Sequence, residues 1–187
     1  MLCESAVMLA LATALSMVVF FQLPAGGSIT VFSMLPILII AYRYGLKWGF
    51  AVGATYGLIQ MLLGLNNLSY ATNALAAVCI ILFDYIVAFG VLGFGGAFRK
   101  MKNQPVGFVL GTVIACVLRF ICHFLTGITV WADYSTGAWS VVAFSFTYNG
   151  SYMLPETLIT AFVGFLLMSL VDFRGEKLRT LRKAEKN

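Results

Sequence analysis

Residues 119–149 read RFICHFLTGITVWADYSTGAWSVVAFSFTYN and contain the only histidine of the chain, His123, with two of its three tryptophans, Trp131 and Trp139. His123, Gly127 and Trp131 recur every four residues, so in a helix they lie on one face over about two turns. The first half of the stretch is apolar enough to lie within a membrane, where a lone ionisable residue marks a candidate functional site. The stretch therefore predicts a membrane helix that carries a polar and aromatic site.

The composition of the whole chain agrees with a membrane location. Of the 187 residues, 61% are hydrophobic and 10% are charged, and the mean hydropathy is +0.95. A soluble domain has about a quarter of its residues charged, so the sequence predicts an integral membrane protein. The chain has room for six spans of about 20 residues each and for no separate soluble domain. Since the N-terminus lacks the features of a cleavable signal peptide, we expect the first apolar segment to remain in the protein.

We therefore expect one all-α domain, residues 1–187, with six transmembrane helices joined by short loops. Three of these segments, the first, third and fifth, carry small residues four positions apart, which favour close helix packing in lipid. In the first segment these residues are Ala6, Ala10 and Ala14. The six expected helices cover about residues 4–22, 31–42, 48–63, 74–95, 106–130 and 149–172.

The basic residues predict how the chain is oriented in the membrane. Eleven of the twelve Lys and Arg residues lie in the 43–47 turn, in the 99–102 loop or after Asp172, and the other three loops contain none. The positive-inside rule then places both termini in the cytoplasm, with residues 173–187 as a basic cytoplasmic tail. The net charge of +5 arises from these clusters and does not indicate nucleic-acid binding.

Four polar residues within the expected spans are singled out as costly in lipid: Asp84, Arg119, His123 and Asn149. A central Asp or Arg costs roughly 2.5–3.5 kcal/mol on insertion scales, so each of these residues needs a partner or a function. Asp84 is a candidate ion-pair partner of Arg119. Two interpretations stay open on chemistry alone: a buried ion pair that only joins two helices, or a polar cavity in the outer half of the membrane.

The aromatic residues favour the cavity. Trp131 shares a helical face with His123, and Tyr56 and Tyr85 are expected to face the membrane interior. Aromatic faces around a carboxylate suit a planar cationic ligand, because a desolvated cation–π contact is worth about 2 kcal/mol. The aromatic residues expected near the membrane surface are typical of interface anchors; these are Tyr70, Tyr134 and Trp139.

The chain lacks the sequence signs of catalysis. It has no Walker motif, no paired-carboxylate metal site, no Ser/His dyad at helical spacing and no second histidine. We therefore expect a binding subunit without a cofactor and not an enzyme. Three alternatives stay open: a stand-alone proton- or ion-coupled carrier with Asp84, Arg119 and His123 as its relay, an intramembrane enzyme, and a structural membrane protein.

Four stretches resemble one known family. They are HFLTGITVW (residues 123–131), FSFTYNGSYMLPE (144–156), PAGGSITVFSMLPI (24–37) and FDYIVAFG (83–90). Taken together, and with the six expected spans, they are similar to the thiamine-specific S components of energy-coupling factor (ECF) vitamin transporters. The resemblance implies a multi-pass protein of a bacterial cell membrane that captures thiamine from outside for ATP-driven uptake. Its implied partners are an ECF transmembrane subunit, docked through the face of Ala6, Ala10 and Ala14, and two ATPase subunits.

The resemblance also implies the residues that line the thiamine pocket. Asp84 would contact the aminopyrimidine or balance the thiazolium charge, His123 and Trp131 would stack on the rings, and the 23–30 loop would close over the ligand. The implied substrate-binding residues are Tyr56, Asp84, Tyr85, His123, Gly127, Trp131, Phe144 and Asn149.

This sequence departs from the family pattern at four places. Some members have Trp at the position of Tyr56, Glu at that of Asp84 and Tyr at that of Phe144. Some also carry Trp and Glu in or just after the first outer loop, where this chain reads GGSITV (residues 26–31). These differences leave open an S component for another flat vitamin, such as a B6 vitamer.

Overall fold

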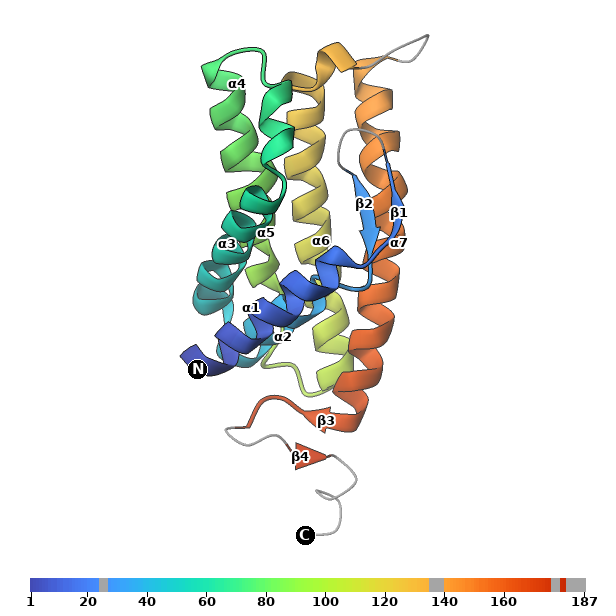
Figure 1. Ribbon diagram of the computed structural model, residues 1–187. Coiled ribbons are helices and arrows are strands. Elements are labelled where there is room, and N and C mark those ends of the chain that lie inside the picture. The colour runs from blue at the N-terminus through green and yellow to red at the C-terminus, as the bar shows by residue number, and fades with distance from the viewer. Residues whose placement is uncertain (24–26, 135–139, 176–178, 181–187) are drawn as a thin grey trace.

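The chain forms a bundle of helices with two short β-hairpins (Figure 1). The computed structural model describes residues 1–23, 27–134, 140–175 and 179–180. Its α-helices are α1 (Leu2–Met17), α2 (Leu35–Tyr44), α3 (Leu46–Leu63), α4 (Ala74–Cys79), α5 (Ala88–Gly90), α6 (Gln104–Thr129) and α7 (Val141–Leu170). The 3₁₀ segments are η2 (Leu65–Tyr70), η4 (Val91–Gly96) and η5 (Ala132–Tyr134), and η3 (Ile80–Val87) is a π-helix. The strands are β1 (Val19–Gln22), β2 (Ser28–Thr30), β3 (Val171–Asp172) and β4 (Arg179–Thr180).

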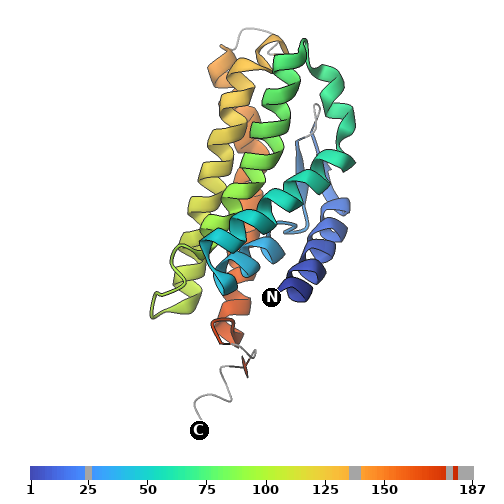
Figure 2. The same ribbon diagram turned by 90° about the vertical axis from the view of Figure 1, so that its left-hand side faces the viewer.

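The expected all-α class is confirmed in its mostly helical character. Within the described residues, three helices are long and apolar enough to cross a membrane: Ala74–Gly96, which runs from α4 through η4, then α6, then α7. They stand side by side in Figures 1 and 2, while α1 crosses the lower half of the bundle obliquely. Because α1 and α2 are shorter apolar helices, the count of six spans stays a prediction.

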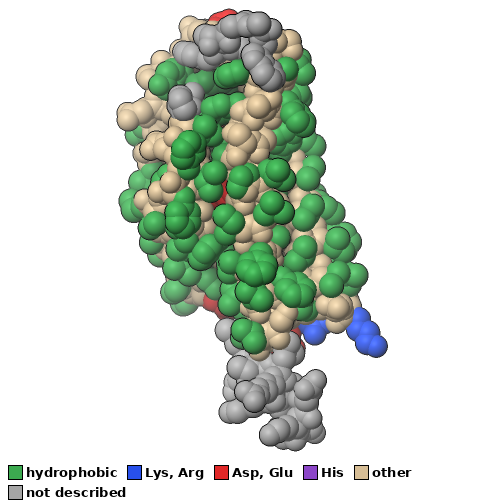
Figure 3. Space-filling model, turned by 90° about the vertical axis from the view of Figure 1, so that its right-hand side faces the viewer, with side chains coloured by type: hydrophobic (Ala, Val, Ile, Leu, Met, Phe, Trp, Pro, Cys, Tyr) green, Lys and Arg blue, Asp and Glu red, His purple; other side chains and the backbone are tan. Residues whose placement is uncertain are grey.

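The outer surface of the bundle is apolar. On the face shown in Figure 3, hydrophobic side chains cover the middle of the molecule and the blue basic side chains appear only at its lower end. Large apolar side chains on the upright helices are more than half exposed, among them Leu75 (74%), Leu154 (64%) and Phe162 (65%). A continuous apolar surface of this kind suits lipid, because exposing so many apolar side chains to water would be unfavourable.

Both ends of the described chain meet at one end of the bundle. The guanidinium of Arg43, in α2, contacts Glu4 in α1 through Nε and Oε1 at 2.9 Å. The same side chain donates to the carbonyl of Phe173, just after α7, at 3.1 Å. Residues 4 and 173 therefore lie on the same side, and the cytoplasmic assignment of that side stays a prediction.

The first expected helix ends earlier than the sequence indicated. It was expected to continue to Gln22, but α1 ends at Met17 and residues 19–22 form β1, which pairs antiparallel with β2. Val18, Val19 and the two phenylalanines that follow are β-branched or aromatic residues, which are compatible with an extended chain, and pairing with β2 then stabilises the strand. Residues 24–26 of the expected 23–30 loop lie outside the described part of the chain.

The last expected helix begins earlier than the sequence indicated, at Val141 and not at Asn149. Ser140 caps it, since its Oγ accepts the N–H of Ala143 at 3.2 Å, a standard way to satisfy a free donor in a first helical turn. The extra turns place Phe144, Ser145 and Tyr148 on the helix that carries Asn149. Trp139, expected as an interface anchor, lies outside the described residues.

Glycines allow the helices to approach closely below the site. A Cβ at Gly57 of α3 would lie 2.5 Å from the carbonyl oxygen of Tyr85, and one at Gly111 of α6 would lie 2.5 Å from that of Gly95. Neither distance is possible for a real side chain, so these positions require glycine. This packing fixes α3 and α6 against the segment that carries Asp84.

Candidate functional site

A cavity of about 750 Å³ opens between the β1–β2 hairpin, α3, η2, η3, α6 and α7. This volume falls in the range of about 300–1,000 Å³ that is usual for small-molecule pockets. All eight residues that the sequence singled out for binding contribute to its lining. They are Tyr56, Asp84, Tyr85, His123, Gly127, Trp131, Phe144 and Asn149.

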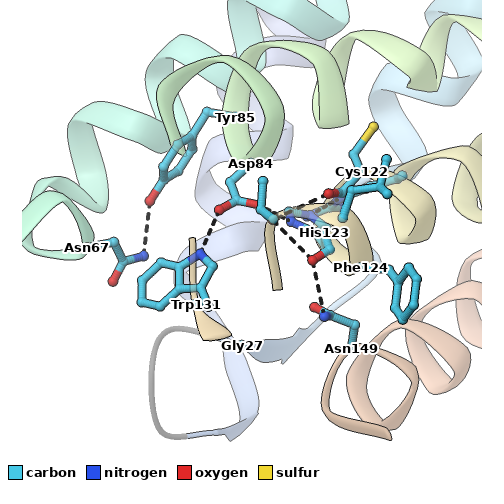
Figure 4. Close-up of polar contacts among 12 residues, drawn as sticks. Gly27, Asn67, Asp84, Tyr85, Cys122, His123, Phe124, Trp131 and Asn149 are labelled. Carbon is cyan, nitrogen blue, oxygen red and sulfur yellow. Dashed lines mark hydrogen bonds and ion pairs between the residues drawn. The ribbon is translucent and has the colours of Figure 1, made fainter. Parts of the chain in front are cut away.

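Asp84 is the centre of the polar contacts in this cavity (Figure 4). Its Oδ1 lies 3.0 Å from His123 Nδ1, and its Oδ2 accepts the indole N–H of Trp131 at 3.0 Å. The hydroxyl of Thr126 also donates to Oδ1. Asp84 belongs to the π-helix η3, whose wider turn lets both Asp84 and Tyr85 line the cavity.

The expected ion pair between Asp84 and Arg119 is wrong. The carboxylate of Asp84 pairs with His123, and the Nε–H of Arg119 donates to the other ring nitrogen of that histidine, Nε2, at 3.3 Å. The guanidinium carbon of Arg119 lies 4.1 Å from the ring centroid of Phe89. Its terminal nitrogen contacts the sulfur of Met34 at 2.7 Å. The three polar groups thus form a row in which histidine separates arginine from aspartate.

Tyr85 connects the site to η2, which follows α3. Asn67 donates its side-chain N–H to the Tyr85 hydroxyl at 3.0 Å, and that hydroxyl donates to the carbonyl of Gly64 at 3.3 Å. Tyr70, expected as a membrane-interface anchor, also lines the cavity, and its ring centroid lies 5.5 Å from that of Trp131. The segment η2 therefore closes one wall of the cavity.

Asn149 and Gly127 join α6 to α7 at the level of the site. The amide of Asn149 donates to the carbonyls of Ser145 and His123 at 3.0 and 3.3 Å, and its oxygen accepts the hydroxyl of Tyr152 at 2.8 Å. A Cβ at Gly127 would overlap the hydroxyl of Ser145. Gly127 therefore allows close helix contact, and Asn149 holds that contact by hydrogen bonds.

The remaining two predicted residues form aromatic walls. Tyr56 is fully buried, and its ring meets that of Phe89 edge-on at 5.1 Å between centroids. Its hydroxyl donates to the carbonyl of Ala12 in α1 at 3.2 Å. Phe144 is stacked on Tyr148, with centroids 5.9 Å apart. Both residues provide apolar faces to the cavity.

A second carboxylate, Glu156, was missed by the sequence reasoning. It is 4% exposed, and its Oε1 accepts the hydroxyl of Thr30 at 2.6 Å and that of Ser33 at 3.4 Å. Higher on α7, the hydroxyl of Tyr148 accepts the backbone N–H of Gly27 at 3.0 Å. Two points on α7 thus hold residues 27–33, the segment at the cavity that contains β2.

Comparison with known proteins assigns this chain to a defined family. A family model described as thiamine transporter protein (Thia_YuaJ) matches residues 2–173. The chain belongs to this thiamine transporter family. It is therefore a multi-pass membrane protein, as its apolar helices indicated.

Two relatives and one solved structure support this membership. The thiamine transporter ThiT of Bacillus subtilis is 34% identical over 178 residues, which cover 89% of this chain and 88% of the relative. ThiT of Lacticaseibacillus paracasei is 24% identical over 149 residues, covering 74% and 72%. The structure of ThiT from Listeria monocytogenes is similar with a TM-score of 0.73 at 26% identity, over 89% of this chain and 91% of that one. These relatives are named as transporters and come from bacteria.

Proposed function

We propose that this family member is an S component that captures thiamine from outside the cell for an ECF-type transporter. The observation that carries the proposal is the carboxylate of Asp84, held by three donors at the wall of an aromatic cavity. Thiamine offers a cationic thiazolium ring and a flat aminopyrimidine, and the two match a carboxylate and aromatic faces. The relatives named as thiamine transporters favour this ligand over a B6 vitamer.

The surface of α1 supports docking to a transmembrane partner. Ala6, Ala10 and Ala14 are all exposed, so no other part of the described chain covers this face. Small residues on a lipid-facing helix let a second helix approach closely. We propose that this face binds the ECF transmembrane subunit, with two ATPase subunits driving release of thiamine, six spans in the membrane and both termini in the cytoplasm.

Titration of the purified, ligand-free protein with thiamine, followed by tryptophan fluorescence, tests the ligand. Trp131 lines the cavity, whereas Trp48 donates its indole N–H to Ser5 at 2.9 Å and does not line it. Saturable quenching should therefore persist in Trp48→Phe and be largely lost in Trp131→Phe. Calorimetry then shows whether the Trp131 variant still binds.

Pyridoxine and riboflavin, titrated in parallel, separate the possible substrates. A response to pyridoxine and none to thiamine would keep the transport role and change the ligand. Absence of binding to every vitamin would contradict the proposal and favour a structural membrane protein.

One observation favours a second candidate, a proton-coupled carrier that works alone. The imidazole of His123 contacts the carboxylate of Asp84, and a proton could pass between these two groups, while Arg119 donates to the same histidine. Proteoliposomes that contain only this chain decide between the two. Thiamine uptake driven by a proton gradient, without ATPase subunits, would support the carrier and contradict the S component.

A further inference from the structure

We propose that Glu156 is a second ligand-binding carboxylate, which accepts a hydrogen bond from a hydroxyl group of the ligand at a level of the cavity away from Asp84. The inference deepens the proposed function and rests on it, since thiamine carries such a hydroxyl at the end of the hydroxyethyl chain on its thiazolium ring. Asp84 binds one part of the ligand and Glu156 another, so the two carboxylates together fix its orientation.

One oxygen of Glu156 is open to the cavity. The residue lines the cavity and is 4% exposed. Its Oε1 accepts the hydroxyls of Thr30 and Ser33, whereas Oε2 accepts no hydrogen bond from the described residues. Oε2 is not among the described, fully buried polar atoms that lack a partner, which are the hydroxyls of Thr112 and Thr160, so it keeps accessible surface. Because an unpaired carboxylate oxygen in a buried place costs free energy, Oε2 is an acceptor for a donor on the ligand.

The carboxylate of Asp84 offers fewer free acceptor positions. Its Oδ1 contacts His123 Nδ1 and accepts the hydroxyl of Thr126, and its Oδ2 accepts the indole N–H of Trp131. Each carboxylate oxygen has two lone pairs, so these contacts occupy both acceptor positions of Oδ1 and one of Oδ2. Asp84 therefore acts on a ligand mainly through its charge, whereas Glu156 presents an oxygen with both acceptor positions free.

Glu156 and Asp84 lie at different levels of the cavity. Asp84 is paired with His123 of α6, and the backbone carbonyl of this histidine accepts the side-chain amide of Asn149 of α7 at 3.3 Å. Glu156 follows Asn149 by seven residues on the same helix, which is about 10 Å along it at 1.5 Å per residue. The two carboxylates are therefore far enough apart to bind different ends of one small ligand.

Arg119 also lines the cavity and is held close to Glu156 by the same segment of chain. Its Nε donates to His123, and its Nη1 contacts the sulfur of Met34. The residue before Met34 is Ser33, whose hydroxyl donates to Glu156. Within the described residues, no Asp or Glu oxygen lies within ion-pair distance of the guanidinium. This part of the cavity thus has a positive donor and a negative acceptor that do not pair with each other.

A hydroxyl group suits both of these side chains, because it donates one hydrogen bond and accepts others. Its hydrogen bonds to Glu156 Oε2, and its oxygen faces the guanidinium of Arg119. A phosphate ester at this position has lost that hydrogen and brings its own negative charge against the carboxylate. An alkyl group leaves the buried oxygen unpaired. We therefore expect the cavity to prefer thiamine with a free hydroxyl over both alternatives.

Calorimetric titration of the purified protein with two ligands tests this preference. The ligands are thiamine and an analogue that carries an ethyl group in place of the hydroxyethyl group. We expect the wild type to bind the analogue at least tenfold more weakly, because a site built to bond a hydroxyl is left unpaired without it. In Glu156→Met, which has a similar length and no acceptor oxygen, the two ligands should bind within about twofold of each other.

Thr30→Val is the matched control. It removes a donor to Oε1 and leaves Oε2 as it is, so it should weaken the binding of both ligands by the same factor and keep the preference for thiamine. Equal affinity of the wild type for the two ligands would overturn the inference, and so would a Glu156→Met variant that keeps the full preference. Thiamine monophosphate that binds the wild type more tightly than thiamine would also overturn it, since Arg119 would then hold an anion here.

A crystal structure of the wild type with thiamine decides the inference even if Glu156→Met does not fold. We expect the hydroxyl oxygen of thiamine within about 3.2 Å of Glu156 Oε2. A hydroxyl bonded elsewhere, with Oε2 out of its reach, would overturn the inference. Wild-type protein that binds no thiamine would overturn the proposed function, on which the inference rests. Thiamine binding without any preference over the ethyl analogue would overturn the inference alone.

Discussion

Three different side chains hold the carboxylate of Asp84, and each contact fixes it against a different part of α6 or the turn that follows. Replacing Asp84 with asparagine removes the negative charge. It also puts a donating NH₂ group opposite at least one of these donors. We expect Asp84→Asn to weaken thiamine binding by at least tenfold, about 1.4 kcal/mol, in calorimetric titration. The control is Asp133→Asn, since Asp133 is exposed in η5 and does not line the cavity. Equal affinity of both variants would show that Asp84 is not the ligand's counter-charge.

The sequence indicated which residues line the cavity better than it indicated their contacts. Spacing along one helix placed Arg119 next to His123, because residues four apart share a face. It gave no information on the rotation of the neighbouring η3, whose π-helical turn directs Asp84 to His123 and not to Arg119. Glu156 could have been found from the same spacing rule, since Asn149, Tyr152 and Glu156 follow at intervals of three and four on one face of α7.

The helices α6 and α7 pack closely where Gly127 meets Ser145. A methyl group at Gly127 would overlap the hydroxyl of Ser145, so Gly127→Ala should destabilise the protein by about 1–3 kcal/mol, the usual cost of overpacking. Thermal unfolding in detergent measures this. Adding Ser145→Gly should recover part of the loss by removing the overlapping atoms.

Gly150 on α7 provides the matched control for this test. Outside its chain neighbours and the backbone of its own helix, no described atom lies within 4 Å of the position that its Cβ would occupy, so Gly150→Ala should leave the unfolding temperature unchanged or raise it. If both glycine variants lost the same stability, helix propensity would explain the effect and close packing would not.

The contact between the hairpin and α7 gives a second prediction for an element. Thr30→Val keeps the shape of the side chain and removes the hydroxyl that donates to Glu156, leaving a buried carboxylate with fewer donors. We expect a loss of about 1–3 kcal/mol and faster hydrogen exchange at the amides of β2. Thr55→Val is the control, because Thr55 is exposed and bonds only within α3. Unchanged exchange in β2 would mean that Glu156 does not hold the hairpin.

The boundaries of the elements were predicted less well than their existence. On hydropathy alone the first helix was expected to continue to Gln22, because a short apolar strand and an apolar helix have the same hydropathy. The last helix was likewise expected only from about Asn149, so residues 141–148 fell outside the predicted helices. In both cases the deciding contacts are tertiary: β1 pairs with β2, and α7 packs along α6.

For the whole molecule, the predicted orientation can be tested on an existing residue. Cys3 is exposed at the start of α1, whereas Cys116 and Cys122 are buried and Cys79 is partly buried in an apolar helix. If the N-terminus is cytoplasmic, a membrane-impermeant maleimide should label Cys3 in inside-out vesicles and not in intact cells. Cys3→Ser should abolish the labelling. Labelling from the outside of intact cells would reverse the orientation proposed here.

One residue, Val18, separates the helix that exposes Ala6, Ala10 and Ala14 from the strand that begins the hairpin over the cavity. The hydroxyl of Tyr56 and the side chain of Gln60 also bond α1, at Ala12 and Ser16. A displacement of α1 is therefore passed to the cavity wall. Thermodynamic linkage then requires reciprocity. If a bound ligand changes the affinity of α1 for a partner by some factor, the bound partner changes the affinity of the cavity for the ligand by the same factor. If α1 binds a partner as proposed, ligand capture and partner binding are coupled through a single continuous segment of chain.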